Sequence, residues 1–509
     1  MKPVVALLIV AAISWAPAAL AQEMHSHPPP EKLGTVSFST SCAQSVSHDF
    51  DRAVALLHSF SYTASEQAFR GVAAADPSCA MAHWGVAMSY FHQLWSPPGA
   101  DELRKGQAEV AKAGHLNLQS PRERQYIAAA AAYYDDSDHL PHSSRAKAYE
   151  EAMSKLARNN PSDTEAQVFF ALSLIATAPP EDRSHANQKR AAAILEPFYR
   201  DHPDHPGVAH YLIHAYDNAE LAPHALSVAR AYSKIAPSAP HALHMPSHIF
   251  TRLGLWDESI ASNIAARAAA HDQGILSEEL HAMDYLTYAY LQLGRSSDAE
   301  HVVATLGAMN GLPASDFIIG YAATAMPIRL AIERQNWSSA ATLQALPESA
   351  PHVAALVFWA RAVANARAGH PQAASDDIGR LETCQRQLQS VGNVYWATQV
   401  DVLRKESNAW RLLASSHSDE AIQRLREAAD QEDGVEKLPV TPGPIVPARE
   451  QLGDMLLELN RPREALQEYR AALVSAPGRR GALAGAAKAA ELIGDIGTAT
   501  RIQTVLADQ

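Results

Sequence analysis

Two pairs of histidines, each pair four residues apart, occur in the middle of the chain. His210 and His214 form the first pair, and His244 and His248 form the second, 34 residues further on. Two histidines at i and i+4 lie on one face of a helix, one turn apart, and can bind one metal ion together. A repeat of the pair at a fixed interval indicates a repeated structural unit whose histidines face the same way. The spacing therefore predicts a metal site built from neighbouring helices.

Further polar residues extend this helix face in three successive units. Counted from the turn of each unit, positions 2, 5, 9 and 12 are spaced by three or four residues, so they lie on one side of a helix. The residues at these positions are His210, His214 and Asp217; His241, His244 and His248; and His281, Asp284 and Tyr288. Neighbouring helices pack about 8 to 10 Å apart, so side chains from two of them can reach one ion.

This face predicts a site with nitrogen and oxygen ligands and no cysteine. Such a ligand set suits a divalent transition metal, namely Zn, Fe, Mn or Cu. The predicted ligands are His210, His214, His244, His248, His281 and Asp284. Asp217 and His241 are predicted as further ligands or as acceptors for imidazole N–H groups, and His281 can instead orient a ligand. The alternative is a polar surface whose histidines bind a peptide or hydrogen-bond one another.

Arg329 takes position 9 of the following unit, on the same face. An arginine beside a cationic site predicts an anionic ligand, such as a carboxylate held by two hydrogen bonds. The alternative is a salt bridge from Arg329 to Asp284 or Glu333. Glu450 and Asp454 hold positions 5 and 9 of a late unit, and the sequence does not show whether they approach the histidines.

Residues 1–21 have the pattern of a secretory signal peptide. Lys2 gives a positive start, residues 4–13 are apolar, and residues 19–21, Ala-Leu-Ala, form a small-x-small cleavage site. The alternative is a membrane anchor, for which the apolar run is short. We expect an exported protein, secreted or periplasmic, with no membrane span in the mature chain and with a flexible tail over residues 22–44.

Composition narrows the class of partner. The 509 residues are 47% hydrophobic and 19% charged, which indicates a folded chain. The formal net charge is −13 and no long block of lysine and arginine is present, so we expect no nucleic-acid partner.

The chain has three cysteines. Cys42 and Cys79 fall just before or at the start of predicted helices in adjacent units, which favours a disulfide between them. Cys384 is then expected to be unpaired and buried. Three unpaired thiols are the alternative.

The most regular repeat is PAREQLGDMLLELNRPREALQEYRAALVSAP, residues 447–477. It matches the tetratricopeptide pattern W-x2-L-G-x2-Y, A-x3-F and P, with Gly453, Ala465, Tyr469 and Pro477 at four of these positions. Small residues let two antiparallel helices approach closely, large ones fill the space between them, and proline ends the second helix.

Helical periodicity fills residues 45–507, and no alternating strand pattern is present. The chain resembles the tetratricopeptide repeat superfamily. More narrowly, it resembles a group of exported bacterial repeat proteins with phrases such as CAMAHWGVAMS, HMPSHIFTRLG and TPGPIVPARE. The resemblance implies an all-α solenoid of helical hairpins, a right-handed superhelix whose concave groove is lined by the face described above. It implies no settled activity.

The predicted organisation is a solenoid with the histidine-lined groove over residues 45–437, a Pro-rich connector over 438–447 and C-terminal repeats over 448–509. The motifs H-E-x-x-H, G-x-S-x-G and G-x-x-x-x-G-K-[ST] are missing from the sequence. Two functions therefore stay open, and the sequence does not decide whether the protein is an enzyme.

The first function is an exported scaffold that binds a peptide, a protein or a small anionic ligand in the groove. The second is a metal-dependent enzyme, hydrolytic or oxidative, that acts there on a small anionic substrate. The predicted ligand-binding residues are Arg329, Tyr288, Asp217 and His241.

Overall fold

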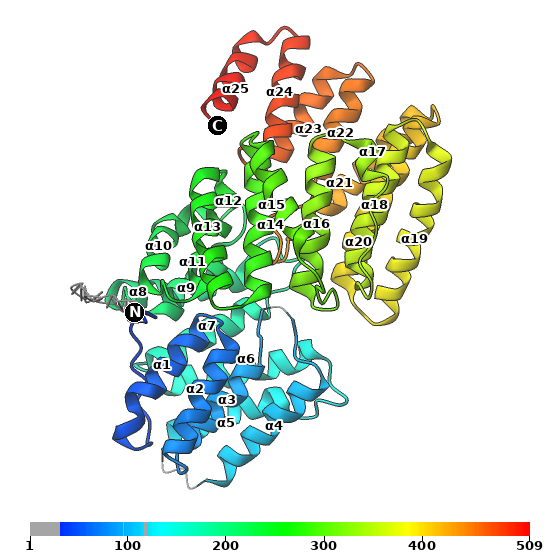
Figure 1. Ribbon diagram of the computed structural model, residues 1–509. Helices are drawn as coiled ribbons and strands as arrows, with labels where there is room; N and C mark the ends of the chain where they lie inside the picture. The colour runs from blue at the N-terminus through cyan, green and yellow to red at the C-terminus, as the bar shows by residue number, and fades with distance from the viewer. Residues whose placement is uncertain (1–30, 95, 117–119) are drawn as a thin grey trace, which may run out of the picture. The chain divides into compact units, whose positions relative to one another are not determined.

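The computed structural model describes residues 31–94, 96–116 and 120–509. All regular secondary structure within these ranges is helical, so the predicted all-α fold class is confirmed for them. Consecutive helices pack against one another along the chain (Figure 1). The predicted signal peptide lies outside the described residues. Within the described residues, no helix combines the length and the hydropathy of a membrane span.

The helices follow the chain in three groups. The first comprises a 3-10 helix, Gln44–Val46, and α1 Ser47–His58, α2 Tyr62–Ala75, α3 Ala80–Tyr90, α4 Ala100–His115, α5 Pro121–Tyr134, α6 His142–Asn159, α7 Thr164–Ala176 and α8 Ala186–Asp201. The second comprises α9 Pro206–Tyr216, α10 Ala222–Ile235, α11 Pro240–His244, α12 Pro246–Leu253, α13 Trp256–Asp272, α14 Leu276–Gln292, α15 Ser296–Ala308 and α16 Phe317–Glu333. The third comprises α17 Trp337–Ala340, α18 Pro351–Arg367, α19 Pro371–Ser390, α20 Val394–Ala414, α21 Ser418–Asp433, α22 Ala448–Glu458, α23 Pro462–Ser475, α24 Arg480–Leu492 and α25 Ile496–Asp508.

The pair α22 and α23 shows why the repeat pattern gives this packing. Gly453 on α22 lies so close to Tyr469 on α23 that an added Cβ would stand 2.7 Å from the ring. Gly485 on α24 contacts the same ring, where a Cβ would lie 2.2 Å away. Ala465 is fully buried. Small residues thus let three successive helices close around one aromatic ring, as in a tetratricopeptide-like hairpin.

The predicted flexible tail, residues 22–44, needs correction where it is described. Leu33 and Phe38 are buried, and Phe38 packs against Trp84 with ring centroids 5.5 Å apart. The backbone N–H of Thr35 donates to the carbonyl of Asp204 at 2.9 Å. Residues 32–43 are therefore packed against the helices, because burying these apolar side chains stabilises the ordered segment.

The predicted connector, residues 438–447, also differs from expectation. Val440 and Ile445 within it are buried. Its backbone contacts helices far away in sequence, since the Tyr285 hydroxyl donates to the carbonyl of Pro439 at 3.3 Å. Figure 1 draws this part of the chain in orange, beside α14. The segment is part of the packed structure rather than a spacer between repeats.

One predicted helix is broken in two. Pro246 has no backbone N–H to donate to the preceding turn, so α11 ends at His244 and α12 begins at Pro246. The break separates His244 from His248, although the two rings still meet, as described below.

Candidate metal centre

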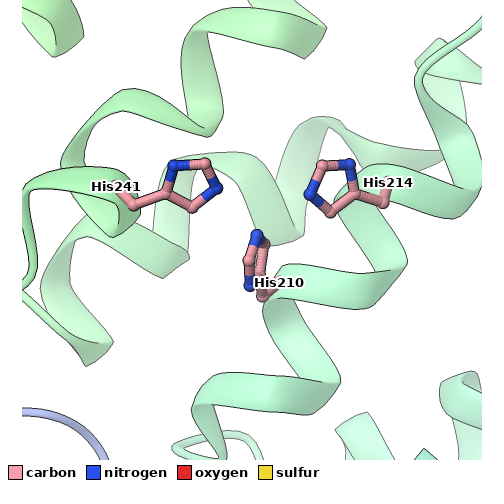
Figure 2. Close-up of side chains that lie close together, drawn as sticks. All are labelled: His210, His214 and His241. Atoms are coloured by element: carbon pink, nitrogen blue, oxygen red, sulfur yellow. The ribbon is translucent and has the colours of Figure 1, made fainter. Parts of the chain in front are cut away.

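Three histidines form the first cluster. His210 and His214 come from α9, and His241 comes from α11. One ring nitrogen of each lies within 4.8 Å of the others, and all three side chains are buried. Figure 2 shows the three rings turned toward a common point. We call this set the first triad.

Three more histidines form the second triad. His244 comes from α11, His248 from α12 and His281 from α14. Their ring nitrogens also lie within 4.8 Å of one another, and all three side chains are buried. The ring centroids of His214 and His248 are 6.2 Å apart, so the two triads are neighbours. The six histidines come from the helix face that the sequence predicts, but they divide into two groups of three.

Hydrogen bonds define which nitrogens of His244 and His248 carry protons. The Nδ1 of His248 lies 2.9 Å from a carboxylate oxygen of Asp217, which can only accept, so Nδ1 carries the proton. The Nδ1 of His244 lies 2.6 Å from Oδ1 of Asn263, whose amide nitrogen donates to Ser259 at 2.7 Å. In both neutral rings the Nε2 atom therefore has a lone pair.

These two Nε2 atoms lie only 2.9 Å apart. Two lone pairs at this distance repel each other unless a proton or a metal ion lies with them. The nearby hydroxyl of Tyr285 is 3.5 Å from Nε2 of His248 and donates to a carbonyl oxygen. The arrangement is therefore suited to a cation that accepts both lone pairs.

Two histidines of the first triad also have an oxygen acceptor at Nδ1. The Nδ1–H of His210 donates to the carbonyl of His58 at 2.6 Å, and the Nε2 of His210 is buried without a hydrogen-bond partner in the described chain. The Nδ1 of His241 lies 3.3 Å from a carboxylate oxygen of Glu278. Histidine ligands of metals commonly donate their second N–H to a carbonyl or carboxylate in this way.

Burial favours the neutral form of His210, His214, His244 and His281. Burial, followed by the neighbouring histidines, holds the pKa of His210, His214 and His244 well below the usual value. Burial lowers the pKa of His281 to about 3. A neutral imidazole is the form that binds a metal, and an all-nitrogen set suits Zn, Cu or Fe.

A third cluster shows what a satisfied histidine network looks like. Glu165 bridges His58 and His205, with Nε2 to carboxylate distances of 2.8 and 2.9 Å. The remaining nitrogens are also used, because His58 Nδ1 lies 3.0 Å from the Tyr211 hydroxyl and His205 Nδ1 accepts from the backbone of Val208. Every ring nitrogen has a complementary partner, so this cluster ties α1, α7 and α9 together without an ion.

Asp217 belongs to neither triad and accepts a hydrogen bond from Nδ1 of His248. Besides His248, its carboxylate accepts from Nε of Arg252 at 2.9 Å. Burial raises the pKa of Asp217, but Lys437 and Arg252 outweigh that effect and hold it well below the usual value. Of the two roles that the sequence allows for Asp217, the structure favours that of an acceptor behind a ligand.

Asp284 and Arg329 correct the predicted site. Asp284 accepts from Nε of Arg329 at 2.8 Å and belongs to neither triad. Arg329 is fully buried and also donates to the carbonyls of Gly443 and Pro444. Its donors are thus engaged within the chain, because the segment 438–447 folds back onto it. The salt-bridge alternative describes this arginine better than a ligand-binding role does.

Tyr288 also lies with this buried arginine rather than with the histidines. The Arg329 guanidinium is 5.2 Å from its ring centroid.

Glu450 accepts from Arg479, another buried arginine, at 2.5 Å. Glu450 and Asp454 line a separate cavity of about 310 Å³, and burial raises their pKa to about 7 and about 6.

Two outer residues are missing from the sequence prediction. Glu278 stands three residues before His281, on the same helix face, so the spacing rule would have found it. Asn263 lies on α13, which contributes no residue to the predicted face, and no motif points to it.

A cavity of about 430 Å³ reaches the first triad at His214. Leu94 and Ile175 are among its apolar lining residues, and Lys437 and Asn218 are among its polar ones. A bound ion would have only three protein nitrogens, which leaves a position open to whatever occupies this cavity.

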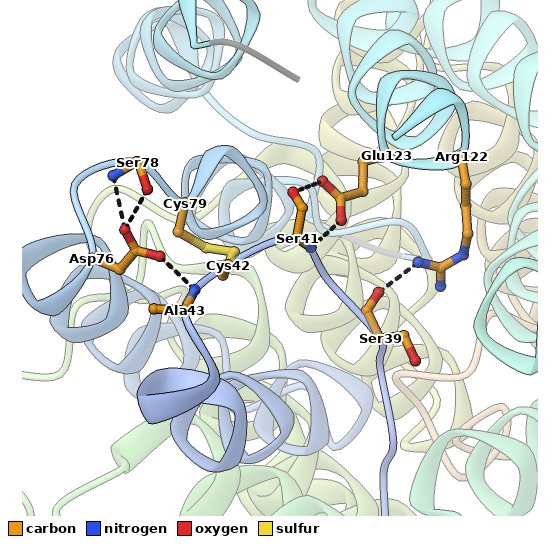
Figure 3. The surroundings of a disulfide bond; sticks show 9 residues. All are labelled: Ser39, Ser41, Cys42, Ala43, Asp76, Ser78, Cys79, Arg122 and Glu123. Carbon is orange, nitrogen blue, oxygen red and sulfur yellow. Dashed lines mark hydrogen bonds between the residues drawn. A yellow bond between two sulfur atoms is a disulfide. The ribbon is translucent and has the colours of Figure 1, made fainter. Parts of the chain in front are cut away.

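The predicted disulfide residues are joined in the structure. Figure 3 shows Cys42 bonded to Cys79, beside a carboxylate of Asp76 that accepts from the backbone of Ala43 at 2.8 Å. Cys384 is unpaired and buried. The bridge fastens the N-terminal segment to the start of α3.

The chain matches no protein-family model and no curated protein. Solved structures that it resembles include a monomeric mutant of IFIT1 with m7Gppp-AAAA, at 12% identity and TM-score 0.38, covering 84% of this chain and 90% of that chain. The human IFIT1 dimer with m7Gppp-AAAA has 11% identity and TM-score 0.36, with coverage of 84% and 90%. The P58(IPK) TPR domain has 13% identity and TM-score 0.23, with coverage of 89% and 99%.

The helices of this chain and their contacts, rather than these likenesses, define the class of the protein. It is a tetratricopeptide-like helical repeat protein with two neighbouring, buried clusters of three histidines.

Proposed function

We propose that this protein binds divalent transition-metal ions, one at each histidine triad. The observation that carries the proposal is the 2.9 Å separation of the His244 and His248 Nε2 atoms, whose Nδ1 atoms face the acceptors Asn263 and Asp217. Neither ring has a proton to place between the two nitrogens while both are neutral. An ion bound by His244, His248 and His281 accounts for this geometry.

The first triad supports a second ion. His210 presents a buried Nε2 lone pair toward His214 and His241, and carbonyl and carboxylate oxygens stand behind His210 and His241. Zinc or copper suits three imidazoles best, while iron and manganese more often add a carboxylate ligand.

Cobalt(II) titration of metal-free protein tests the proposal. Co²⁺ stands in for Zn²⁺ and reports imidazole ligation through its visible absorption. We expect saturation at about two ions per chain. The proposal is contradicted if the titration shows no visible band and no saturable uptake.

Export belongs to the same proposal. The pattern of residues 1–21, the disulfide between Cys42 and Cys79 and the resemblance to exported bacterial repeat proteins support a periplasmic or secreted protein. The intact mass of protein made with its full sequence in a Gram-negative host should correspond to a chain that starts at Gln22. A mass that retains residues 1–21 would exclude cleavage.

A metal-dependent enzyme is the second candidate. The cavity beside His214 favours it, because an open metal position next to a cavity can admit a substrate. Binding of a peptide or protein is the simpler role for a repeat solenoid. In this structure, however, Pro439 and Pro444 of the chain's own segment 438–447 already contact α14 and α16.

A further inference from the structure

We infer that the cavity beside the first triad binds a small organic carboxylate, whose carboxylate group lies between the ion held by His210, His214 and His241 and the ammonium group of Lys437. The inference rests on the proposed metal site. It adds the class of ligand and the residue that recognises it.

The cavity gives access to the first triad. His214, Asp217, Lys437 and Leu438 all line the cavity of about 430 Å³. His214 is the triad member that this cavity reaches. A ligand in the cavity would approach the ion at the position that three imidazoles leave open.

Lys437 has hydrogen-bond donors that no described residue uses. Its Nζ has no hydrogen-bond partner in the described chain and lies 3.6 Å from the carboxylate of Asp217. That carboxylate already accepts from His248 and Arg252. Lys437 is therefore a largely buried cation with donors available to an incoming anion.

The other charges around the cavity are already compensated. Glu436 accepts from Arg252 at 2.8 Å and pairs with Arg183 at 3.0 Å. Asp182 accepts from the backbone and hydroxyl of Ser184. Lys147, which also lines the cavity, is paired with Glu150 at 2.6 Å. Lys437 is thus the better placed of the two lysines to recognise an anion.

Apolar walls define the rest of the ligand. Leu94, Ile175 and Leu438 line the cavity together with Pro179 and Pro180. A ligand that is charged at one end and aliphatic at the other would satisfy both parts of the surface. Since apolar burial adds binding energy with each methylene, a medium-chain carboxylate should bind more tightly than acetate.

Hexanoate binding to Co²⁺-loaded full-length protein tests the inference. We expect hexanoate to change the visible Co²⁺ spectrum with a lower Kd than acetate, and neutral hexanol to leave the spectrum unchanged. Lys437→Gln should weaken hexanoate binding about tenfold or more with unchanged cobalt content. Lys147→Gln, at the other lysine that lines the cavity, is the matched control and should bind hexanoate like the wild type.

Two results would overturn the inference. One is cobalt-loaded wild type that does not respond to hexanoate. The other is a folded Lys437→Gln protein with wild-type affinity for hexanoate. Protein that takes up no cobalt would refute the metal site itself and this inference with it, and is recognised before any carboxylate is added.

Discussion

Nε2 of His244 lies 2.9 Å from Nε2 of His248, while Asn263 and Asp217 accept from the opposite sides of the two rings. Satisfied histidine contacts pair a donor with an acceptor, as Glu165 does for His58 and His205. In the His244–His248 contact, both of the facing Nε2 atoms are acceptors. The difference between the two clusters is the physical basis of the proposed metal site.

Removing the acceptor behind a ligand should weaken the metal site without removing a ligand. Asp217→Asn keeps the side-chain shape but replaces the carboxylate that accepts from His248. We expect the affinity of the second triad for Zn²⁺ to fall about 10- to 100-fold. Competition with a chromophoric chelator measures this change. Asp377→Asn, a buried aspartate paired with Arg361, is the control and should leave Zn²⁺ affinity unchanged.

The buried pair Asp284 and Arg329 should matter for stability rather than for metal binding. Arg329→Met leaves the Asp284 carboxylate buried and unpaired, so the free energy of unfolding should fall by about 3–5 kcal/mol. The double variant Asp284→Asn/Arg329→Met should lose less than the sum of the single variants. Urea unfolding of the four proteins tests this, and additive losses would show that the pair is not coupled.

His352 should make the protein sensitive to acid. Its ring stacks on Trp396 with centroids 4.4 Å apart, and both ring nitrogens lack hydrogen-bond partners in the described chain. Burial lowers the pKa of His352 to about 4. The unfolded chain binds this proton near pH 6.5 and the folded chain only near pH 4, so stability is lost as pH falls through this range.

His352→Phe keeps the stacked ring and removes the proton site. Relative to the wild type, it should gain about 2–3 kcal/mol of stability on going from pH 8 to pH 4.5. Chemical unfolding at the two pH values gives the comparison. An equal effect of the substitution at both pH values would show that His352 does not contribute to acid sensitivity.

The disulfide should stabilise the N-terminal segment. Cys42 and Cys79 are 37 residues apart, and closing a loop of that length removes about 4 kcal/mol of chain entropy from the unfolded state in the loop-closure model. Cys42→Ser/Cys79→Ser should therefore melt at a lower temperature than the oxidised wild type. Addition of a reductant should lower the melting temperature of the wild type and not that of the variant. Equal melting of both proteins without reductant would argue against a stabilising bridge.

Local pattern accounts for what the sequence could predict. The spacing of three and four residues placed His210, His214, His244 and His248 on one helix face, and the glycine and alanine positions of the repeat predicted the α22–α23 hairpin. These features depend on residues within one unit and its neighbour.

Long-range contacts account for the differences. Arg329 donates to Pro444, 115 residues further along the chain, and this contact turns a predicted ligand-binding residue into part of the core. The six histidines divide into two triads within α11, between His241 and His244, and spacing alone does not give this division. Burial of Phe38 likewise depends on Trp84 and other aromatic rings that are distant in sequence.

Metal content by inductively coupled plasma mass spectrometry tests the central claim most directly. The proteins are wild type, His244→Ala/His248→Ala and the control His83→Gln, all purified without a histidine tag and saturated with Zn²⁺ before desalting. His83 pairs with Glu109 and belongs to neither triad. We predict about two zinc ions per chain in the wild type and the control, and about one in the double variant, with helical content unchanged. Equal, sub-stoichiometric zinc in all three proteins would contradict the account.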